Sequence, residues 1–293
     1  MIDIKGKNAL ITGSSRGIGQ QIAKGLAALG CNMIIHGRTE ESCSETSQLL
    51  KSYNIQCYCV YGDLSDETSL NALIQQVKNL NISIDILYNN AAIMSPYRKD
   101  YWTHSWDDWM LSMKVNVFSV YTLSGAFIPE MIENGFGRVV NLISGIKNEP
   151  ELLPYGASKS ALMKLTEEIA SKLDGTGVRI NALDPGWLRT DLGGEFADHP
   201  VEAVLPGALA PALIENNGAN GVAFEAITSD YDTETHSKKV IITSPVLFFL
   251  FQVRDYLCIC FQIQLNIKML RHIKFFINIF TSKTYLLITY YML

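Results

Sequence analysis

Short apolar runs alternate with longer amphipathic stretches over the first three quarters of the chain. The runs are rich in β-branched and aromatic residues and lie at 7–12, 32–36, 56–61, 85–89, 138–143 and 178–183. Short runs that are apolar throughout are typical of strands buried on both faces, as in a parallel sheet. The stretches at 66–80, 105–134 and 155–174 carry apolar residues at helical spacing. This alternation predicts an α/β fold with a doubly wound, Rossmann-type parallel sheet in a single domain.

The pattern changes near residue 227, which we take as the end of this domain. Residues 227–293 contain neither Gly nor Ala, although both are common before them, and they are rich in Phe, Ile, Leu and Tyr. The longest stretch without a charged residue runs from 240 to 253 and has 14 residues. Crossing a bilayer takes roughly 20 apolar residues, so this stretch is too short to span one.

Three interpretations of residues 228–293 stay open. The segment is an appendage that packs on the domain, an anchor that associates weakly with a membrane surface through its basic and aromatic residues, or translated non-coding sequence without ordered structure. We favour the last, because Phe, Ile, Lys, Asn and Tyr have AT-rich codons whereas Gly and Ala need GC-rich ones. No chemistry is assigned to this segment.

Charge and cysteine content narrow the class of protein. The 24 Lys and Arg residues against 29 Asp and Glu give a net charge of −5, whereas a nucleic-acid binder needs a basic surface. The six cysteines form no C-x-x-C pair, and no histidine cluster accompanies them, so neither a disulfide framework nor a metal site is expected. The chain does not begin with a basic segment followed by an apolar run. We therefore expect a cytoplasmic protein that binds neither nucleic acid nor metal.

The first apolar run leads into the sequence TGSSRGIG at 12–19, which a helical pattern follows. Glycines between a strand and a helix let the backbone approach a pyrophosphate, which then meets free N–H groups at the helix N-terminus. The spacing G-x-x-x-G-x-G differs from the general dinucleotide motif, and a tight turn alone also needs small residues. Its position after the first strand favours a dinucleotide site. The cofactor contacts assigned here are Gly13, Ser15, Arg16, Gly17, Ile18 and Gly19.

The end of the second apolar run bears on the choice of cofactor. Proteins that bind NAD often place an acidic residue there to hold the adenosine ribose, whereas this chain has His36, Gly37 and Arg38. The acids that follow come after Thr39, which has the character of a helix N-cap. Arg16 and Arg38 are either a clamp for a ribose 2′-phosphate or two solvated surface side chains. The missing acid favours NADP(H) over NAD(H).

Tyr155 and Lys159 stand four residues apart in a helical pattern, so their side chains share one helix face. With other motifs they carry a resemblance to the classical short-chain dehydrogenase/reductase family, which extends over about residues 5–226. The markers of the family occur in the expected order. They are TGSSRGIG at 12–19, Asp63-Leu64, NNAA at 89–92, Asn116, Ser144, YGASK at 155–159 and DPGWLRT at 184–190.

The resemblance implies a catalytic tetrad of Asn116, Ser144, Tyr155 and Lys159. Tyr155 is expected to act as the general acid that protonates a substrate carbonyl as hydride arrives. Lys159 is expected to lower the pKa of this tyrosine, which is about 10 in the free residue, and to hydrogen-bond the nicotinamide ribose. Ser144 is expected to hydrogen-bond the carbonyl oxygen. Asn116 is expected to hold a water that relays protons between Lys159 and solvent.

The resemblance also assigns cofactor contacts outside the glycine-rich turn. Asp63 is expected to bind the adenine amino group with Leu64 beside it, and Asn89 and Ala91 are expected to lie along the adenosine. The nicotinamide end is assigned to Pro185, Gly186, Leu188 and Thr190, together with Tyr155 and Lys159. Residues of these types are also common at strand ends for purely structural reasons.

We therefore expect an NADPH-dependent oxidoreductase that interconverts a carbonyl and an alcohol by hydride transfer. The alternatives are a 3-oxoacyl-carrier-protein reductase, a sugar or polyol dehydrogenase, and a non-catalytic NADP-binding regulator. A small or medium-sized, mainly apolar ketone or aldehyde is favoured as the substrate, because the segment after Thr190 is apolar with few charges. The helices at 105–134 and 154–174 are expected to form a homodimer or homotetramer, as is typical of the family.

Three segments are expected to decide the choice of substrate, at 94–109, 145–154 and 191–214. In the first of them, Trp102 and Trp106 are candidates to cover a pocket, whereas Trp109 is assigned to the helix core. Arg98 and Lys99 either meet an anionic substrate or are solvated loop residues.

Overall fold

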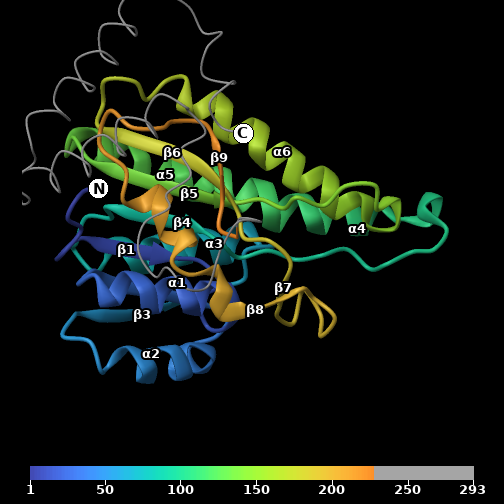
Figure 1. Cartoon of the computed structure of the whole chain (residues 1–293), viewed down its shortest axis with the longest axis horizontal. Coiled ribbons are helices and arrows are strands. Elements are labelled where there is room, and N and C mark those ends of the chain that lie inside the picture. The colour runs from blue at the N-terminus through green and yellow to red at the C-terminus, as the bar shows by residue number, and fades with distance from the viewer. Residues whose placement is uncertain (228–293) are drawn as a thin grey trace, which may run out of the picture. The chain divides into compact units, whose positions relative to one another are not determined.

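The computed structural model describes residues 1–227 of the chain. One sheet has the strand order β3-β2-β1-β4-β5-β6-β9, and every neighbouring pair in it is parallel (Figure 1). Its strands are β1 (Asn8–Ile11), β2 (Asn32–Gly37), β3 (Cys57–Tyr61), β4 (Ile86–Asn89), β5 (Gly137–Leu142), β6 (Val178–Asp184) and β9 (Ala223–Glu225). The predicted doubly wound parallel sheet is therefore confirmed. The predicted tail at 228–293 lies outside the described residues, so the domain boundary at 227 stays a prediction.

Three strands of the structure were not predicted from the apolar pattern. β9 has three residues, of which two are exposed, so it lacks the apolar run that marks the other strands of the sheet. It is held as a strand by backbone pairing of Ala223–Glu225 with the end of β6. The separate two-stranded sheet of β7 (Leu188–Arg189) and β8 (His199–Pro200) is shorter still. Elements of two or three residues are too short to show a period.

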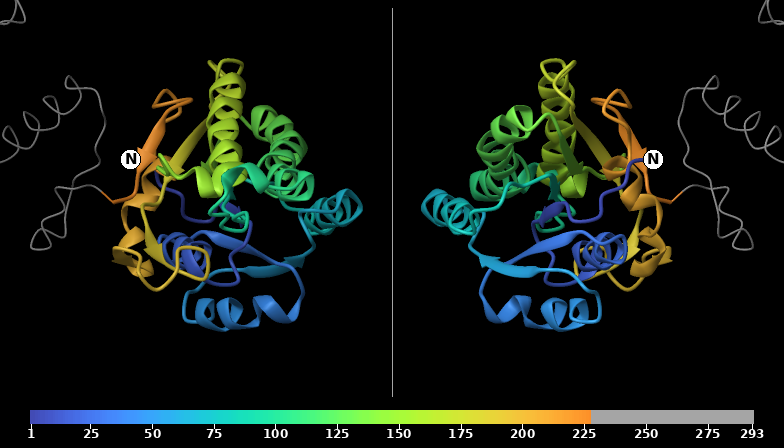
Figure 2. Two further views of the ribbon diagram at one scale, coloured as in Figure 1. Left: turned by 90° about the vertical axis from the view of Figure 1, so that its right-hand side faces the viewer. Right: turned by 90° about the vertical axis from the view of Figure 1, so that its left-hand side faces the viewer.

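Helices cover both faces of the sheet (Figures 1 and 2). The α-helices are α1 (Gly17–Ala28), α2 (Ser44–Leu50), α3 (Glu67–Lys78), α4 (Trp106–Met113), α5 (Ser119–Glu133) and α6 (Leu153–Ala170). Short helices connect them or follow β8: η1 (Glu41–Cys43), η2 (Tyr101–Thr103), η3 (Lys114–Phe118), η4 (Pro150–Leu152), η5 (Val201–Val204) and η6 (Gly207–Ala212). The predicted helices at 66–80 and 155–174 correspond to α3 and α6.

Successive strand residues point to opposite faces and so build two separate hydrophobic cores. Ile11 and Ile35 pack in one core with α1, α2 and η6. Leu10 and Ile34, one position away on the same strands, pack in the other core with α3, α5 and α6. Both faces are buried, which explains why the strands are apolar throughout rather than alternating.

The predicted helix at 105–134 consists of three pieces. Between α4 and α5, the turn η3 is a π-helix, in which the N–H of Ser119 donates to the carbonyl of Lys114, five residues back. Such π-turns are frequently found at functional sites. By length and composition Trp106–Glu133 is the one helix of the described residues that would suffice to cross a membrane. More than half of its most apolar window, 56%, is buried inside the domain, as in the core helix of a globular protein.

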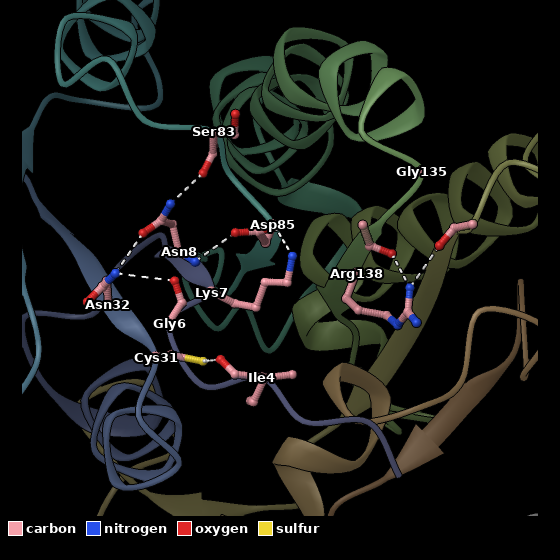
Figure 3. A network of polar contacts seen from close by, with 12 residues as sticks. Ile4, Gly6, Lys7, Asn8, Cys31, Asn32, Ser83, Asp85, Gly135 and Arg138 are labelled. Carbon is pink, nitrogen blue, oxygen red and sulfur yellow. Dashed lines mark hydrogen bonds and ion pairs between the residues drawn. The ribbon is translucent and has the colours of Figure 1, made fainter.

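A polar network joins the amino ends of the strands, opposite the edge where the site lies (Figure 3). The Nζ of Lys7 donates to Asp85 Oδ1 at 2.8 Å, and the N–H of Asn8 donates to Asp85 Oδ2 at 2.9 Å. Asn32 Nδ2 donates to Asn8 Oδ1 at 3.0 Å. These contacts tie β1, β2 and the residue before β4 together.

Arg138 is fully buried in the same region, although no acidic residue forms an ion pair with it among residues 1–227. Its guanidinium instead donates to backbone carbonyls: Nε and Nη2 to Ile214 at 3.0 and 2.8 Å, and Nη1 to Gly177 at 3.0 Å. Nη2 also donates to Asn216 Oδ1 at 2.7 Å. Burial lowers the pKa of Arg138 to about 10. This side chain therefore fastens the segment before β9 to the sheet.

Replacing Arg138 by lysine should destabilise the domain, because an ammonium group cannot reach three separate carbonyl groups and leaves buried acceptors unpaired. We expect the Arg138→Lys variant to lose about 2–4 kcal/mol of unfolding free energy, measured by urea denaturation. Arg189→Lys, at an exposed arginine, is the control and should lose less than about 1 kcal/mol. Equal losses in the two variants would contradict this role of Arg138.

Candidate active site

The glycine-rich turn joins β1 to α1 at the point where strand order reverses, since β1 pairs with β2 on one side and β4 on the other. Doubly wound sheets bind ligands at the carboxyl ends of their strands at such a point. Gly13 and Gly17 have φ of +63° and +61°, a conformation that favours glycine. A Cβ on Gly13 would lie 2.9 Å from the Cα of Ala91, and one on Gly19 would lie 2.5 Å from Asn90 Nδ2. The turn thus needs glycine to approach the residues after β4.

The N-terminus of α1 has the properties of an anion site. Its N-cap residue, Arg16, makes no side-chain capping hydrogen bond, and the first turn holds no acidic residue. The first N–H groups of a helix have no partner within it, and the helix dipole favours a negative charge there. This arrangement suits the pyrophosphate of a dinucleotide, with Gly17, Ile18 and Gly19 as donors. The residues of the turn therefore fit an NAD(P) cofactor.

Three side chains to which the sequence analysis assigned no role hold this turn in place. Thr46 on α2 donates its hydroxyl to the carbonyls of Ser14 and Ser15 at 2.9 and 3.0 Å. Asn90 Nδ2 donates to the carbonyls of Thr12 and Gly13 at 2.8 and 3.0 Å. His36 accepts from Gly13, as described below. The position of His36 and Asn90 at strand ends was the sequence feature that could have selected them, whereas nothing in the sequence marks Thr46.

On the adenosine side, the structure brings together the ends of β2 and β3. Arg38 is exposed, and Asp63 is exposed with Leu64 buried beside it. The N–H and hydroxyl of Ser65 donate to Asp63 Oδ1 at 2.8 and 2.7 Å. These hydrogen bonds are the main cause that lowers the pKa of Asp63, and the positive charge of Arg38 adds to the effect. A charged carboxylate and a guanidinium therefore stand at the edge assigned to adenosine.

The two adenosine contacts predicted at the end of β4, Asn89 and Ala91, have different surroundings. Asn89 is buried, and its Nδ2 donates to Asn141 Oδ1 on β5 at 2.8 Å, so its amide faces the interior of the sheet. Ala91 lies against Gly13, and its N–H donates to Thr12 Oγ1 at 3.0 Å.

Arg16 forms an ion pair with Asp191. Its Nε lies 2.6 Å from Asp191 Oδ2, and both side chains are largely exposed. Exposed ion pairs contribute little, with a typical range of about 0–1 kcal/mol. In the structure Arg16 is paired with Asp191 through Nε, while Nη1 and Nη2 of its guanidinium carry further N–H donors.

The nicotinamide side is formed by the segment after β6. Pro185 and Leu188 are buried, and Gly186 has φ of +77° with its N–H donated to Asp184 Oδ1 at 3.0 Å. Thr190 lies beside the glycine-rich turn, since a Cβ on Gly17 would lie 3.6 Å from its Cγ2. The fold thus brings the segment 185–190 next to the residues 12–19.

Tyr155 and Lys159 lie buried on one face of α6, at the carboxyl end of β5. Lys159 Nζ donates to the carbonyl of Leu142 at 2.6 Å and lies 5.8 Å from the ring centre of Tyr155. Ser144, two residues after that carbonyl, is half-buried, and its Oγ accepts from the N–H of Ile146 at 3.3 Å. The structure therefore brings three of the four predicted catalytic residues to one place.

The protonation of this cluster is governed by burial. Burial raises the pKa of Tyr155 above its usual 10, whereas a hydrogen bond with Ser144 acts in the opposite direction. Burial lowers the pKa of Lys159 to about 8, and the nearby carboxylate of Asp184 opposes that shift. The negative charge of Asp184 also raises the pKa of Tyr155. The predicted lowering of this pKa by Lys159 stays a prediction for the protein with its cofactor bound. Asp184, at the end of β6, is a further charge near this cluster; it lies in the DPGWLRT motif, but the sequence analysis assigned it no role.

Asn116 lies in the π-turn η3 and is completely buried. Its Oδ1 accepts from the N–H of Ile93 at 3.0 Å, and its Nδ2 donates to the carbonyl of Ile93 at 2.9 Å. Nδ2 also donates to Ser158 Oγ at 2.9 Å, and that hydroxyl donates to the carbonyl of Tyr155 at 2.7 Å. Asn116 therefore connects the segment after β4 with α6, so it is not an exposed helix residue.

In the predicted substrate segment 94–109, the structure shows the pairing of one charged residue and the exposure of the tryptophans. Arg98 donates from Nε and Nη2 to Asp108 Oδ2 at 2.9 and 2.7 Å, so its charge is already paired. Trp102 and Trp106 are 80% and 77% exposed, and covering a pocket stays a prediction for them. Trp109, which was assigned to the helix core, is half-buried near the N-terminus of α4.

The chain was compared with known proteins. A family model described as short chain dehydrogenase matches residues 7–200. A 3-oxoacyl-acyl-carrier-protein reductase of Aquifex aeolicus is 33% identical over 194 residues, which are 65% of this chain and 77% of the relative. A gluconate 5-dehydrogenase of Gluconobacter oxydans is 32% identical over 197 residues, 66% of this chain and 75% of the relative. The crystal structure of a gluconate 5-dehydrogenase from Burkholderia cenocepacia in complex with NADP and tartrate has a TM-score of 0.66 and 28% identity, covering 75% of this chain and 93% of that one.

A parallel doubly wound sheet with a glycine-rich turn and an uncapped helix N-terminus at its switch point is typical of dinucleotide-binding proteins. The family match over residues 7–200 makes the class specific: the chain belongs to the short-chain dehydrogenase/reductase family. It is an NAD(P)-dependent oxidoreductase that acts on CH–OH groups.

Replacing Lys159 by methionine should stabilise the protein at neutral pH. The native pKa is about 8 and the ordinary value is 10.5, so below pH 8 the native state carries a buried charge. The wild type therefore gains stability as pH rises from 8 to 10.5, where only the unfolded lysine remains protonated. We expect Lys159→Met to add about 1–2 kcal/mol of unfolding free energy at pH 7 and nothing at pH 10.5.

Urea denaturation at both pH values measures this difference. Lys164→Met is the matched control, because Lys164 is an exposed lysine of the same helix that pairs with Glu168. It should lose about 0.5 kcal/mol or less at pH 7. A less stable Lys159→Met protein at pH 7 would mean that the hydrogen bond to Leu142 outweighs the burial of charge.

Proposed function

We propose that this protein uses NADPH to reduce a ketone or aldehyde to an alcohol, with Tyr155 as the general acid. The observation that supports this most is the burial of Tyr155 and Lys159 on one face of α6, close to Ser144 and Asp184. A binding protein has no need of a buried lysine whose pKa is lowered to about 8, since strongly shifted groups cluster at sites that transfer protons.

Each residue has a task in the proposed reaction. The bound nicotinamide supplies the hydride. The hydroxyl groups of Ser144 and Tyr155 donate hydrogen bonds to the carbonyl oxygen, which gains negative charge, and Tyr155 then transfers its proton to it. Lys159 stabilises the resulting phenolate by its positive charge. Asn116 holds the segment after β4 and helix α6 together through its hydrogen bonds with Ile93 and Ser158. It is also the residue proposed to hold the water of the proton relay.

The preference for NADPH is proposed from the charges at the end of β2. Arg38 is exposed there, and no acidic residue occupies the end of that strand. A guanidinium binds a phosphate group through two parallel hydrogen bonds, whereas an acid would repel it. A solved relative from Burkholderia cenocepacia is described in complex with NADP, which agrees with this proposal. Arg16, which pairs with Asp191 through Nε, is proposed as a second contact to that phosphate through its other nitrogens.

A small or medium-sized, mainly apolar carbonyl compound is proposed as the substrate. The pairing of Arg98 with Asp108 removes one of the two basic groups that would favour an anion. The names of the relatives keep acyl thioesters and sugar acids as further classes to test. A gluconate-like substrate would need a free cation near Tyr155, and Lys99 is the exposed candidate in the segment 94–109.

Turnover of a carbonyl panel with NADPH and with NADH tests the proposal. The panel spans acetoacetyl thioesters, keto sugars, quinones and aryl ketones. We expect kcat/KM with NADPH to exceed that with NADH by about tenfold or more on one class, because a phosphate–arginine contact is a charge-assisted hydrogen bond. Tyr155→Phe should lower kcat about a thousandfold and leave NADPH binding within about threefold.

Tyr58→Phe, at a tyrosine in β3 that bonds to Gln56, is the control and should keep full turnover. NADPH binding by the wild type without turnover of any panel member would instead favour a non-catalytic regulator. A preference for NADH would overturn the assignment of Arg38.

We further propose that the protein acts as a homodimer or homotetramer through the helix formed by α4, η3 and α5. Leu111, Phe118 and Tyr121 lie along this helix and are 46%, 48% and 62% exposed. Three large apolar side chains on one helix are a typical protein-interaction surface.

Light scattering on the full chain measures the oligomeric state. We expect the mass of two or four chains, and a shift to the monomer for Tyr121→Arg, because a buried unpaired charge strongly opposes association. Tyr97→Arg, at a tyrosine that is 65% exposed in the segment before α4, is the control. A monomeric wild type contradicts the proposal.

The cytoplasm is proposed as the compartment. The four cysteines of the described residues, Cys31, Cys43, Cys57 and Cys59, are free thiols. Burial raises the pKa of Cys31 to about 12 and those of Cys43 and Cys57 to about 11, so these thiols stay protonated and unreactive. Free thiols of this kind agree with a reducing environment.

A further inference from the structure

His36 occupies an unusual position between the two halves of the cofactor site. It lies near the carboxyl end of β2 and is only 2% exposed. Its Nδ1 accepts the N–H of Gly13 at 3.0 Å, at the start of the glycine-rich turn. Its Nε2 lies 3.1 Å from the carbonyl of Gly62, the residue before Asp63. One imidazole ring therefore bridges the pyrophosphate turn and the adenosine edge.

These two partners determine the tautomer of the ring. A backbone N–H can only donate and a carbonyl can only accept, so Nδ1 must be unprotonated and Nε2 must carry the proton. A doubly protonated ring would turn an N–H group toward the N–H of Gly13. The contacts with Gly13 and Gly62 are therefore compatible only with the neutral imidazole that is protonated at Nε2.

The backbone of His36 adds two contacts to the same turn. Its N–H donates to Ser14 Oγ at 2.9 Å, and its carbonyl accepts from the N–H of Ser14 at 3.0 Å. The N–H groups of Gly13 and Ser14 are thus both used by His36 and are not available to a ligand. The donors left for a pyrophosphate are those at the start of α1, so the direction in which Gly13 is held decides where they point.

We propose that His36 is a positioning residue of the cofactor site: its neutral ring holds Gly13 and Gly62 at the separation and orientation in which the turn accepts the pyrophosphate. This inference rests on the cofactor binding at the turn proposed above. His36 does not contact the reacting atoms. It contributes to cofactor affinity through the one hydrogen bond that Nδ1 accepts.

The surroundings of His36 keep the ring neutral at physiological pH. Burial lowers its pKa to about 4, although the carboxylate of Asp63 and the carbonyl of Gly62 act in the opposite direction. The titratable or charged groups on the elements packed around it are Arg38 after β2, Glu41 and Cys43 in η1, Cys57, Tyr58, Cys59 and Tyr61 in β3, and Asp63 after β3. An unfolded histidine titrates near 6.5. The contribution of the neutral His36 ring to the free energy of unfolding is therefore complete above pH 6.5 and is lost as pH falls toward 4.

Two substitutions separate the hydrogen bond from simple packing. In His36→Asn, the amide oxygen is as many bonds from Cβ as Nδ1 and can still accept from Gly13. In His36→Gln, the amide nitrogen corresponds to Nε2, so it can donate to Gly62 while the acceptor for Gly13 is lost. Both variants remove the ring and both keep a polar amide, which makes each the control of the other.

Titration calorimetry of the full chain with NADP⁺ at pH 7.5 is the first measurement. We expect His36→Gln to raise the Kd about tenfold, the effect of one lost hydrogen bond, and His36→Asn to stay within about threefold of the wild type. Equal affinities for the two variants overturn the inference while leaving the proposed function intact. A wild type that binds neither NADP⁺ nor NAD⁺ overturns the proposed function and the inference together.

A second measurement needs no cofactor. Nitrogen-15 NMR of the histidine rings in the free protein distinguishes protonated from unprotonated ring nitrogens, and His36→Asn identifies the resonance. We expect Nε2 of His36 to be protonated and Nδ1 to be unprotonated from pH 6 to 8, with titration only below about pH 5. A ring protonated at Nδ1, or one that titrates near 6.5, overturns the inference.

Discussion

The close approach of the glycine-rich turn to the residues after β4 is the constraint on which the site depends. A side chain at Gly13 or Gly19 would collide with Ala91 or Asn90, so only glycine lets β1 and β4 end beside each other with the turn between them. This closeness leaves the N-terminus of α1 uncapped and open at the switch point of the sheet. The hydrogen bonds of Asn90, Thr46 and His36 then fix a segment that glycine alone would leave flexible.

Two buried cations both carry the desolvation cost of a charge, but they differ in how completely that charge is paired. Arg138, at the amino ends of the strands, is surrounded by carbonyl groups that accept from each of its nitrogens. Lys159, at the carboxyl ends, has the Leu142 carbonyl as its hydrogen-bond partner and a lowered pKa. A fully paired cation stabilises the fold. An incompletely paired one costs stability but can exchange or stabilise charge during a reaction.

Most of the fold was predictable because parallel strands buried on both faces are apolar throughout, a pattern visible without any long-range contact. The interruption of the helix at 105–134 was not predictable, since KVNVF has no residue that marks a π-turn. Asn116 could be selected from its motif, but its contacts with Ile93 and Ser158 depend on the packing of α6 against η3. The pairing of Arg16 with Asp191 joins residues 175 positions apart, and no local pattern carries such information.

The sequence by itself determined the order along the chain of the six longer strands and the place of the glycine-rich turn, because these patterns are local. The residues proposed for catalysis were selected by resemblance to the family. Only the tertiary structure decided how the side chains are charged and paired. The pKa of Tyr155 is raised rather than lowered, because the cost of burying a charge depends on the surrounding atoms. His36, one residue of a strand in the sequence, becomes the bridge between Gly13 and Gly62 only when three strand ends meet at one edge of the sheet.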